Sequence, residues 1–160
     1  MTAFYTYHTP IGYITITANE KAVVKIAFGK KEGGEQEGSE QKETSQLKIA
    51  STQIEEYFAG KRRVFDFPIQ PKGTPFQLQV WAALRQIPYG QTRSYKQIAE
   101  AIGHPKACRA VGMANNKNPL PIVVPCHRVI GADGKLVGYA GGLEVKKKML
   151  ELEKSTTFVC

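Results

Sequence analysis

The apolar residues of this chain change their spacing near residue 73, and that change limits the folds that the chain can adopt. Before it, Ile14 and Ile16 alternate with threonines, which is the two-residue period of a half-buried strand. Other short runs rich in β-branched and aromatic residues lie at 4–7 and 23–28. After it, apolar residues follow clear helix start signals. We therefore predict a mixed α/β fold, with a strand-rich part that contains a helix and a mostly helical part.

Four further segments of the first part differ in composition. Residues 30–45 are polar, with three glycines and no large apolar residue, so we expect a loop. Residues 45–59 carry apolar side chains at positions that suit one helix face. Residues 64–67 are rich in valine and phenylalanine and predict one more short strand, and residues 68–73 are a good linker.

The second part begins with strong helix start signals. We place a domain boundary at the linker, between a first domain over 1–73 and a second over 74–160. Residues 74–77 (Thr-Pro-Phe-Gln) combine an N-cap threonine, a proline and a glutamine in a capping box. Residues 94–97 (Ser-Tyr-Lys-Gln) repeat this pattern, and a further helix is expected over 105–115. Two short helices joined by a glycine-containing turn are typical of a helix-turn-helix.

The positive charge of the chain is concentrated in its second domain. The net charge is +8. Residues 1–73 contain ten Lys or Arg against nine Asp or Glu, a net of +1, whereas residues 74–160 contain twelve against five, a net of +7. A polyanion such as nucleic acid is the natural partner of a surface like this. The alternative is a basic face that only keeps the protein soluble.

Cys126 stands in a sequence context that favours reactivity. The apolar residues 122–124 predict a short buried strand that stops at Pro125, and Cys126, His127 and Arg128 follow at once. The thiolate is the nucleophilic form of cysteine, and neighbouring cations lower the pKa of a thiol. His127 can take the proton directly or through a water, while Arg128 either adds positive charge or anchors carbonyl groups. The alternative is a small cysteine buried in a core.

Other classes of site find little support. A cysteine hydrolase needs a distant base, and neither of the other histidines, His8 and His104, has neighbours that suggest one. No Cys-x-x-Cys or His-x-x-x-His spacing exists, so we expect no metal site. The three cysteines are few and far apart, as in a reducing compartment. There is neither a secretory signal nor an apolar run near twenty residues, so we expect a protein without a membrane span that is cytoplasmic, or nuclear if the host is a eukaryote.

Several blocks of the second domain together carry a family resemblance. Residues 122–130 read Ile-Val-Val-Pro-Cys-His-Arg-Val-Ile. Residues 109–112 (Arg-Ala-Val-Gly) and 118–119 (Asn-Pro) precede them, and residues 138–143 (Gly-Tyr-Ala-Gly-Gly-Leu) follow. In sequence and spacing these blocks resemble the O6-alkylguanine-DNA alkyltransferase family, also called methylated-DNA–protein-cysteine methyltransferases. The resemblance is close over about residues 74–154, and the first domain fits by its strand-rich pattern.

This resemblance implies direct-reversal DNA repair. Cys126 would take an alkyl group irreversibly from O6 of guanine, once per molecule and without a cofactor. The partner would be double-stranded DNA carrying O6-alkylguanine, with the damaged nucleotide flipped out of the helix, and O4-methylthymine would be a secondary lesion. We expect a monomer. Two alternatives stay open, a module that binds lesions without transfer and a transcription regulator that uses the helix-turn-helix.

The resemblance also implies roles for single residues. His127 would act as a water-mediated base, and Glu153 would orient it. Asn118 would fix the turn before the active-site segment. Tyr95 would press on the DNA backbone and offer its hydroxyl to the damaged base. Arg109 would enter the base stack and occupy the space of the flipped nucleotide, at a helix-turn-helix that lies in the minor groove.

The remaining expectations concern DNA contacts, the base pocket and metal. The expected DNA contacts are Arg109, Tyr95, Ala110, Gly112, Lys96, Lys106 and Arg128. The expected base pocket is formed by Val137, Gly138, Tyr139 and Ala140. Some family members have a serine at the position of Ala140, and some bind zinc in the first domain. No cysteine precedes Cys108 here, so we expect no zinc site.

Overall fold

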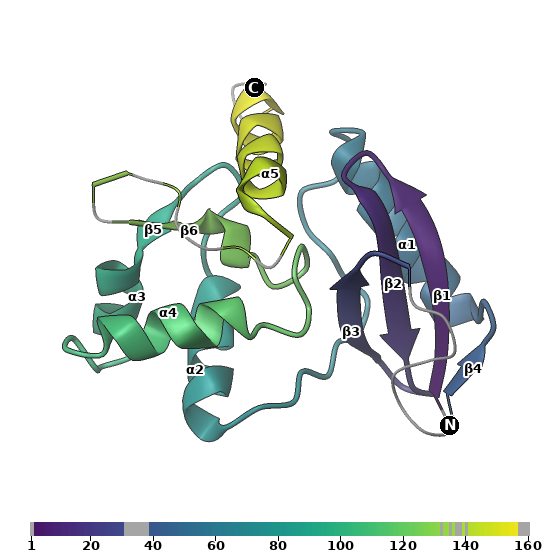
Figure 1. Cartoon of the computed structure of the whole chain (residues 1–160), viewed down its shortest axis with the longest axis horizontal. Helices are drawn as coiled ribbons and strands as arrows, with labels where there is room; N and C mark the ends of the chain where they lie inside the picture. Colours follow the sequence, from purple (N-terminus) through teal and green to yellow (C-terminus); the bar gives the residue numbers. More distant parts are fainter. Residues whose placement is uncertain are drawn as a thin grey trace. The chain divides into compact units, whose positions relative to one another are not determined.

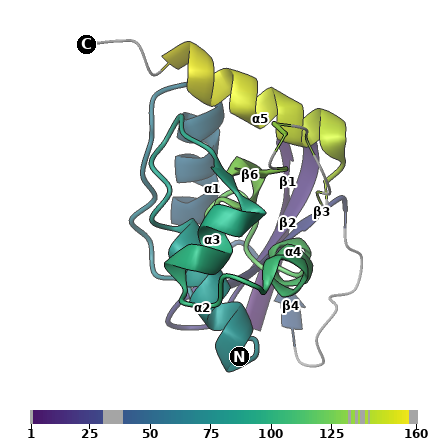
Figure 2. The same cartoon turned by 90° about the vertical axis from the view of Figure 1, so that its left-hand side faces the viewer.

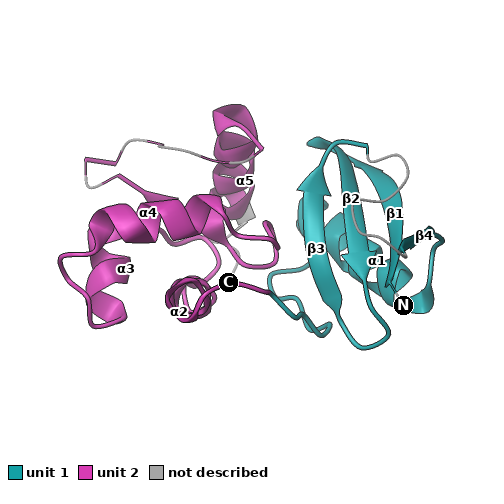
Figure 3. Cartoon of the chain, turned by 60° about the horizontal axis from the view of Figure 1, so that its bottom comes forward, with its two compact units in different colours: residues 1–71 teal, residues 72–160 magenta. Residues whose placement is uncertain are grey.

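The chain forms two compact units, Met1–Pro71 and Lys72–Cys160 (Figure 3). The computed structural model describes residues 2–30, 39–131, 133–134, 136, 139 and 141–156. The first unit combines a sheet with a helix, and the second is mostly helical. The predicted mixed α/β fold class is therefore confirmed.

A sheet with strand order β3-β2-β1-β4 forms the centre of the first unit (Figure 1). Strands β1 (Thr2–Thr9), β2 (Gly12–Ala18) and β3 (Val23–Phe28) are antiparallel neighbours, as their alternating residues predict. Strand β4 (Ser39–Gln41) pairs in parallel with β1. It lies within a segment that we expected to be a loop, and its polar residues gave no strand pattern.

Helix α1 (Ser45–Phe58) lies across one face of this sheet (Figure 1). It begins where predicted, because the side chain of Thr44 accepts a hydrogen bond from the amide of Leu47 and so caps the first turn. Leu47, Ile54 and Tyr57 are at most 1% exposed and form the apolar face of the helix. Together with the fully buried Ile14 of β2 they supply much of the core of this unit.

The strand predicted at residues 64–67 is wrong. The backbone groups there bond to side chains instead of to a neighbouring strand: the amide of Asp66 donates to Gln53 Oε1, and the carbonyl of Val64 accepts from Arg62. Pairing with β3 occurs only at Ile69, an isolated bridge to Val23. Val64 is left 71% exposed, which a core strand would not allow.

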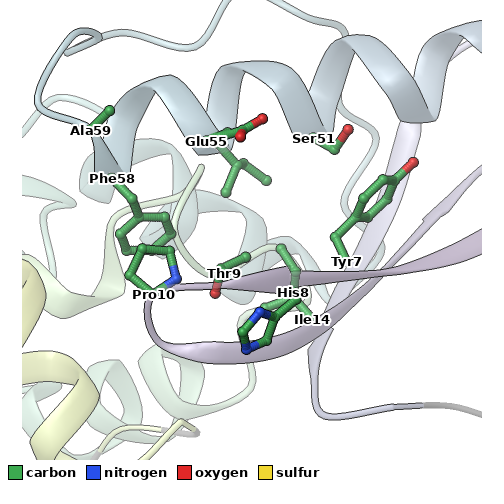
Figure 4. Close-up of a pocket in the computed structure, with 10 residues that line it drawn as sticks. Tyr7, His8, Thr9, Pro10, Ile14, Ser51, Glu55, Phe58 and Ala59 are labelled. Atoms are coloured by element: carbon green, nitrogen blue, oxygen red, sulfur yellow. The ribbon is translucent and has the colours of Figure 1, made fainter.

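A surface pocket of about 320 Å³ lies beside helix α1 in the first unit. Figure 4 shows Phe58 of α1 close to Pro10, with Tyr7 and His8 contributed by β1. The Tyr7 hydroxyl donates to Glu43, at 2.7 Å. None of the predicted site residues lines this pocket, so the predicted chemistry belongs to the second unit.

Capping boxes start two helices of the second unit, as predicted. Thr74 accepts from the Gln77 amide at 3.1 Å and Gln77 Oε1 accepts from the Thr74 amide at 2.9 Å, so α2 (Pro75–Leu84) begins at Pro75. Ser94 and Gln97 make the same pair of bonds at 3.1 and 2.8 Å and start α3 (Tyr95–Ala101). Because these bonds are local, the sequence alone predicts them well.

Helix α4 (Cys108–Asn116) follows α3 after a short turn, and the two helices pack against each other (Figures 1 and 2). The turn passes through Gly103, whose φ of +80° favours glycine. Helix α4 begins three residues later than predicted, because the amide of Ala107 bonds to the carbonyl of His104 and closes a separate turn. The two-helix arrangement itself follows the prediction.

The strand predicted at residues 122–124 is also wrong. This segment is a buried turn in which Ile122 has a φ of 77° and the Val124 amide bonds to the Leu120 carbonyl. Asn118 takes the place of a neighbouring strand, since its Oδ1 accepts from the Leu120 amide at 2.9 Å and its Nδ2 donates to the Val124 carbonyl at 2.8 Å. Residues 122–124 are apolar because they are buried on all sides. The spacing of apolar residues cannot distinguish such a buried turn from a buried strand.

A short parallel pair flanks this segment, and sequence reasoning did not find it. Strand β5 (Arg93–Ser94) pairs with β6 (Val129–Ile130). Helix α5 (Leu143–Thr156) ends the described part of the unit. In the described ranges no helix has both the length and the apolar character that crossing a membrane requires.

Candidate active site and DNA-binding surface

Cys126 opens a 3-10 turn, η1 (Cys126–Arg128), directly after the buried segment. The residue is only 4% exposed. Its amide donates a hydrogen bond to the Val124 carbonyl at 2.7 Å, and its carbonyl accepts one from Nδ2 of Asn115 at 3.4 Å. The backbone on both sides of the thiol is therefore held by hydrogen bonds, which fixes the direction of the Cα–Cβ bond of Cys126.

Burial raises the pKa of the Cys126 thiol to about 11. A hydrogen bond from Asn118, the charge of Lys146 and the amides of Cys126 and His127 act in the opposite direction but are weaker. We expected neighbouring cations to leave this pKa low, and desolvation outweighs them instead. At neutral pH the thiol is protonated and needs a base before it can act as a nucleophile.

The side chain of His127 lies against a buried carboxylate. Its Nε2 is 2.6 Å from Oε2 of Glu153 on α5, and both residues are at most 1% exposed. Burial lowers the pKa of His127, although its hydrogen bond to Glu153 and the negative charge of that carboxylate oppose this. The imidazole is therefore neutral at rest and able to accept a proton.

Glu153 connects the histidine to an arginine and to a loop. Arg128 donates to it twice, through Nε at 2.8 Å and Nη2 at 3.1 Å, and the Gly90 amide donates at 3.1 Å. Burial alone would raise the pKa of Glu153, but the hydrogen bonds from His127 and Arg128 and the positive charge of Arg128 lower it to about 2. The carboxylate stays ionised and can stabilise a proton on the neighbouring imidazole.

Arg128 was expected to contact DNA, but its position in the structure does not fit that role. The residue is 7% exposed. Its guanidinium bonds to Glu153 and, through Nη1, to the Ile87 carbonyl at 2.8 Å, and it lies 5.6 Å from the ring centre of Tyr89. A guanidinium with these internal partners does not reach a phosphate outside. The sequence left two roles open for Arg128, and in the structure this residue anchors a carbonyl group.

Two tyrosines lie near the thiol. Burial and then the negative charge of the Cys126 thiolate raise the pKa of Tyr95, which starts α3. A Cβ built at Gly112 of α4 would be 3.8 Å from the Tyr95 ring, an ordinary packing distance, so Gly112 faces this tyrosine. Burial also raises the pKa of Tyr139, whose hydroxyl lies 3.5 Å from Sδ of Met149. Both phenols are protonated hydrogen-bond donors at neutral pH.

The other residues of the expected base pocket, Val137, Gly138 and Ala140, lie outside the described residues.

Most of the expected DNA contacts lie on the surface of α3, α4 and the turn between them. Lys96, Lys106, Arg109 and Ala110 are exposed. Helix α4 has no Asp or Glu, so nothing on that helix opposes an anion. Exposed cations on adjoining elements fit a phosphate backbone.

Two family models together match almost the whole chain. Residues 75–155 match the DNA binding domain of 6-O-methylguanine DNA methyltransferase, and residues 3–71 match its ribonuclease-like domain. The chain belongs to the 6-O-methylguanine DNA methyltransferase family. The resemblance inferred from residues 74–154 is thereby confirmed, and it extends over the first unit.

Similar proteins match more than nine tenths of this methyltransferase chain. Methylated-DNA–protein-cysteine methyltransferase of Methanosarcina acetivorans is 50% identical over 150 residues, which are 93% of this chain and 96% of that protein. The constitutive enzyme of Bacillus subtilis is 46% identical over 159 residues, or 96% of each chain. A crystal structure of Mycobacterium tuberculosis OGT in complex with DNA has a TM-score of 0.87 and 44% identity, and the match covers 96% of this chain and 94% of that one.

Sequence reasoning missed two buried polar residues of this methyltransferase site. Lys146 is fully buried, and its Nζ donates to the Val129 carbonyl at 2.6 Å. It shares a face of α5 with Met149 and Glu153, at a spacing of three and seven residues, which is the signal that could have revealed it. Asn115, on the buried side of α4, is only 2% exposed. Within the described ranges no cluster of three or more His, Cys, Asp or Glu residues is placed to hold a metal ion.

Proposed function

We propose that this methyltransferase takes the alkyl group from O6 of guanine in double-stranded DNA and keeps it on Sγ of Cys126. The observation that carries the proposal is a buried thiol next to the hydrogen-bonded trio of His127, Glu153 and Arg128. In the reaction the S–C bond forms as the C–O6 bond breaks, and the electron pair of that bond goes to the purine. A soft, polarisable sulfur suits such an in-line displacement at saturated carbon.

The proton of the thiol moves to His127. Glu153 occupies Nε2 of the ring, so Nδ1 is the atom that takes the proton, directly or through a water. The carboxylate stabilises the imidazolium that results, while Arg128 holds the carboxylate in place. Tyr95, a protonated phenol, donates a hydrogen bond to the departing guanine, and the imidazolium returns a proton to it. The thioether that remains is inert, so each molecule reacts once.

The damaged nucleotide must leave the base stack before it reaches this thiol, which is 4% exposed. Extruding a nucleotide costs a few kcal/mol of stacking and pairing. We propose that α4 lies in the minor groove and that Arg109, exposed near its first turn, fills the vacated space. O4-methylthymine is a weaker substrate of the same site.

Transfer is tested by its stoichiometry. Purified protein is mixed with an excess of duplex carrying O6-methylguanine labelled in the methyl group, and the label bound to protein is measured over time. We expect a plateau at one methyl group per molecule. Tight binding without label would support a lesion-binding module instead, and a footprint with a strong sequence preference on undamaged duplexes would support a transcription regulator.

The replacement Arg109→Ala separates flipping from chemistry. We expect transfer from duplex DNA to slow about tenfold to a hundredfold, because part of the extrusion cost is no longer offset. Transfer from free O6-benzylguanine needs no flipping and should stay unchanged. Arg85→Ala, which removes an exposed arginine at the end of α2, is the control and should leave both rates unchanged. Equal losses on both substrates would contradict the proposed place of Arg109 in the stack.

The replacement Lys146→Met tests the electrostatics around the thiol. Lys146 lowers the pKa of Cys126, so an apolar side chain of similar length should raise that pKa further. The pH profile of Cys126 alkylation by iodoacetamide would then move to higher pH. Lys147→Met changes an exposed lysine on the same helix and should leave the profile in place. A profile that does not move, in a variant with unchanged thermal unfolding, would show that Lys146 does not act on the thiol.

We also propose that the protein works as a monomer in the cytoplasm. The described groups around Cys126 all come from one unit of a single chain, so the site needs no second copy. Light scattering on a sizing column, with and without a short duplex, tests the monomer. Cell fractionation tests the location.

A further inference from the structure

Helix α4 places a large apolar side chain in the middle of its exposed face. Met113 is 63% exposed, although the helix buries Val111, Ala114 and Asn115 on its other side. The other exposed residues of the helix are Arg109, Ala110 and Asn116, and the exposed Lys117 caps its C-terminal end. Gly112, beside Met113, is half-buried.

We infer that Met113 packs directly on the DNA, against sugars and base edges one helical turn from Arg109, and helps to hold the duplex in a bent form from which the nucleotide leaves. This inference rests on the proposed function, because it assumes that α4 is the helix in the groove. The residue roles predicted from the sequence do not include a DNA contact by Met113.

The spacing places Met113 and Arg109 on the same part of a duplex. Four residues of helix span about 6 Å, and successive base pairs are about 3.4 Å apart. A helix that directs Arg109 at one nucleotide therefore brings Met113 within about two base pairs of it. Both side chains project from the same face, since residues four apart are neighbours on a helix surface.

Charge and size identify DNA as the occupant of this face. Arg109 and Lys117 lie four residues before and after Met113, and α4 carries no acidic residue. A polyanion is therefore attracted to both ends of this face, whereas a neutral protein surface would not be. Ala110 and Gly112 are short, so the helix can approach closely and Met113 projects beyond these two residues.

The chemistry of methionine suits this position. Its unbranched, polarisable side chain adapts to an irregular apolar surface. Deoxyribose rings and base edges offer such a surface between the phosphates. Proteins in the minor groove insert apolar wedges, methionine among them, and these kink the duplex. A kink at this point weakens stacking where Arg109 enters.

The test compares Met113→Ala with Met113→Leu, which keeps an apolar side chain of similar volume. Affinity for a methylated duplex is measured by fluorescence anisotropy in the Cys126→Ala background, and bending by energy transfer between dyes at the duplex ends. We expect Met113→Ala to weaken binding about fivefold and to reduce bending, because buried apolar contact is lost. Met113→Leu should stay within about twofold.

Two controls make the outcome specific. Leu78→Ala removes another exposed apolar side chain, 40% exposed on α2, and should change neither affinity nor bending. Transfer from free O6-benzylguanine, measured with Cys126 present, should be unchanged in both Met113 variants. Wild-type affinity and bending in Met113→Ala would overturn the inference, and so would an equal loss in Leu78→Ala, or a change in oligomeric state with DNA binding intact.

The result is distinguishable from a failure of the proposed function. If wild-type protein takes up one methyl group and Met113→Ala binds as wild type does, only the Met113 contact is overturned. If wild-type protein takes up no methyl group, the transfer proposal falls whatever the Met113 variants do.

Discussion

Replacement of Cys126 by alanine is expected to abolish methyl transfer completely and to leave DNA binding intact. The reacting atom is Sγ, and no other described side chain at the site offers a thiol. Alanine leaves the hydrogen bonds made by the Cys126 backbone in place, so the buried segment should keep its shape. Transfer is measured with a labelled methyl group, and binding by anisotropy on the same methylated duplex.

Cys108→Ala is the matched control. Cys108 is a half-buried free cysteine at the start of α4, outside the network around Glu153. We expect this variant to keep wild-type transfer. Residual transfer in Cys126→Ala, or its loss in Cys108→Ala, would mean that the methyl acceptor is a different residue.

Glu153→Gln is expected to lower both stability and rate. The change removes the only carboxylate that bonds to His127 and Arg128 among the described residues, and leaves a buried guanidinium without its anion. Breaking a buried ion pair from one side destabilises a protein by about 3–5 kcal/mol. Loss of support for the proton on His127 should also slow transfer about a hundredfold. Urea unfolding measures the first effect, and O6-benzylguanine transfer the second.

The same residue predicts a pH dependence of stability. The pKa of Glu153 falls from its ordinary value of 4.5 to about 2 in the folded protein. Its stabilising contribution is therefore complete above about 4.5 and is lost as the pH falls toward 2. The free energy of unfolding of the wild type should drop through that window, and Glu153→Gln should lack this part of the drop.

Glu151→Gln, an exposed change two residues earlier on α5, is the control for both measurements. It should behave as the wild type in urea and in transfer. If Glu153→Gln unfolds at the wild-type urea concentration and transfers at the wild-type rate, the buried network has neither of the roles assigned to it.

Local signals in the sequence predicted the helices well. The capping boxes at Thr74 and Ser94 use bonds between residues three apart, so α2 and α3 begin where the pattern says. The alternation of Ile14 and Ile16 likewise predicted β2. The segment at 122–124 failed because its apolar residues are buried by packing from several elements, and a side chain, Asn118, satisfies the backbone there.

The site was only partly accessible to sequence reasoning. Cys126 and His127 are adjacent in the chain, so their pairing could be seen at once. The role of Glu153 came from the family resemblance, because a contact between residues 26 apart depends on how α5 packs. The internal position of Arg128 and the contribution of Lys146 depend on the same packing. A motif shows which residues are close in the sequence but not which of them are buried.

One measurement tests the central claim most directly. Wild-type protein is incubated with duplex containing O6-methylguanine, digested, and each cysteine-containing peptide is sequenced by mass spectrometry. We predict that the peptide with Cys126 is heavier by one methylene, with fragment ions that place the added mass on the sulfur, and that the duplex then contains guanine. An unmodified Cys126 peptide, after incubation long enough for binding to saturate, would contradict the account.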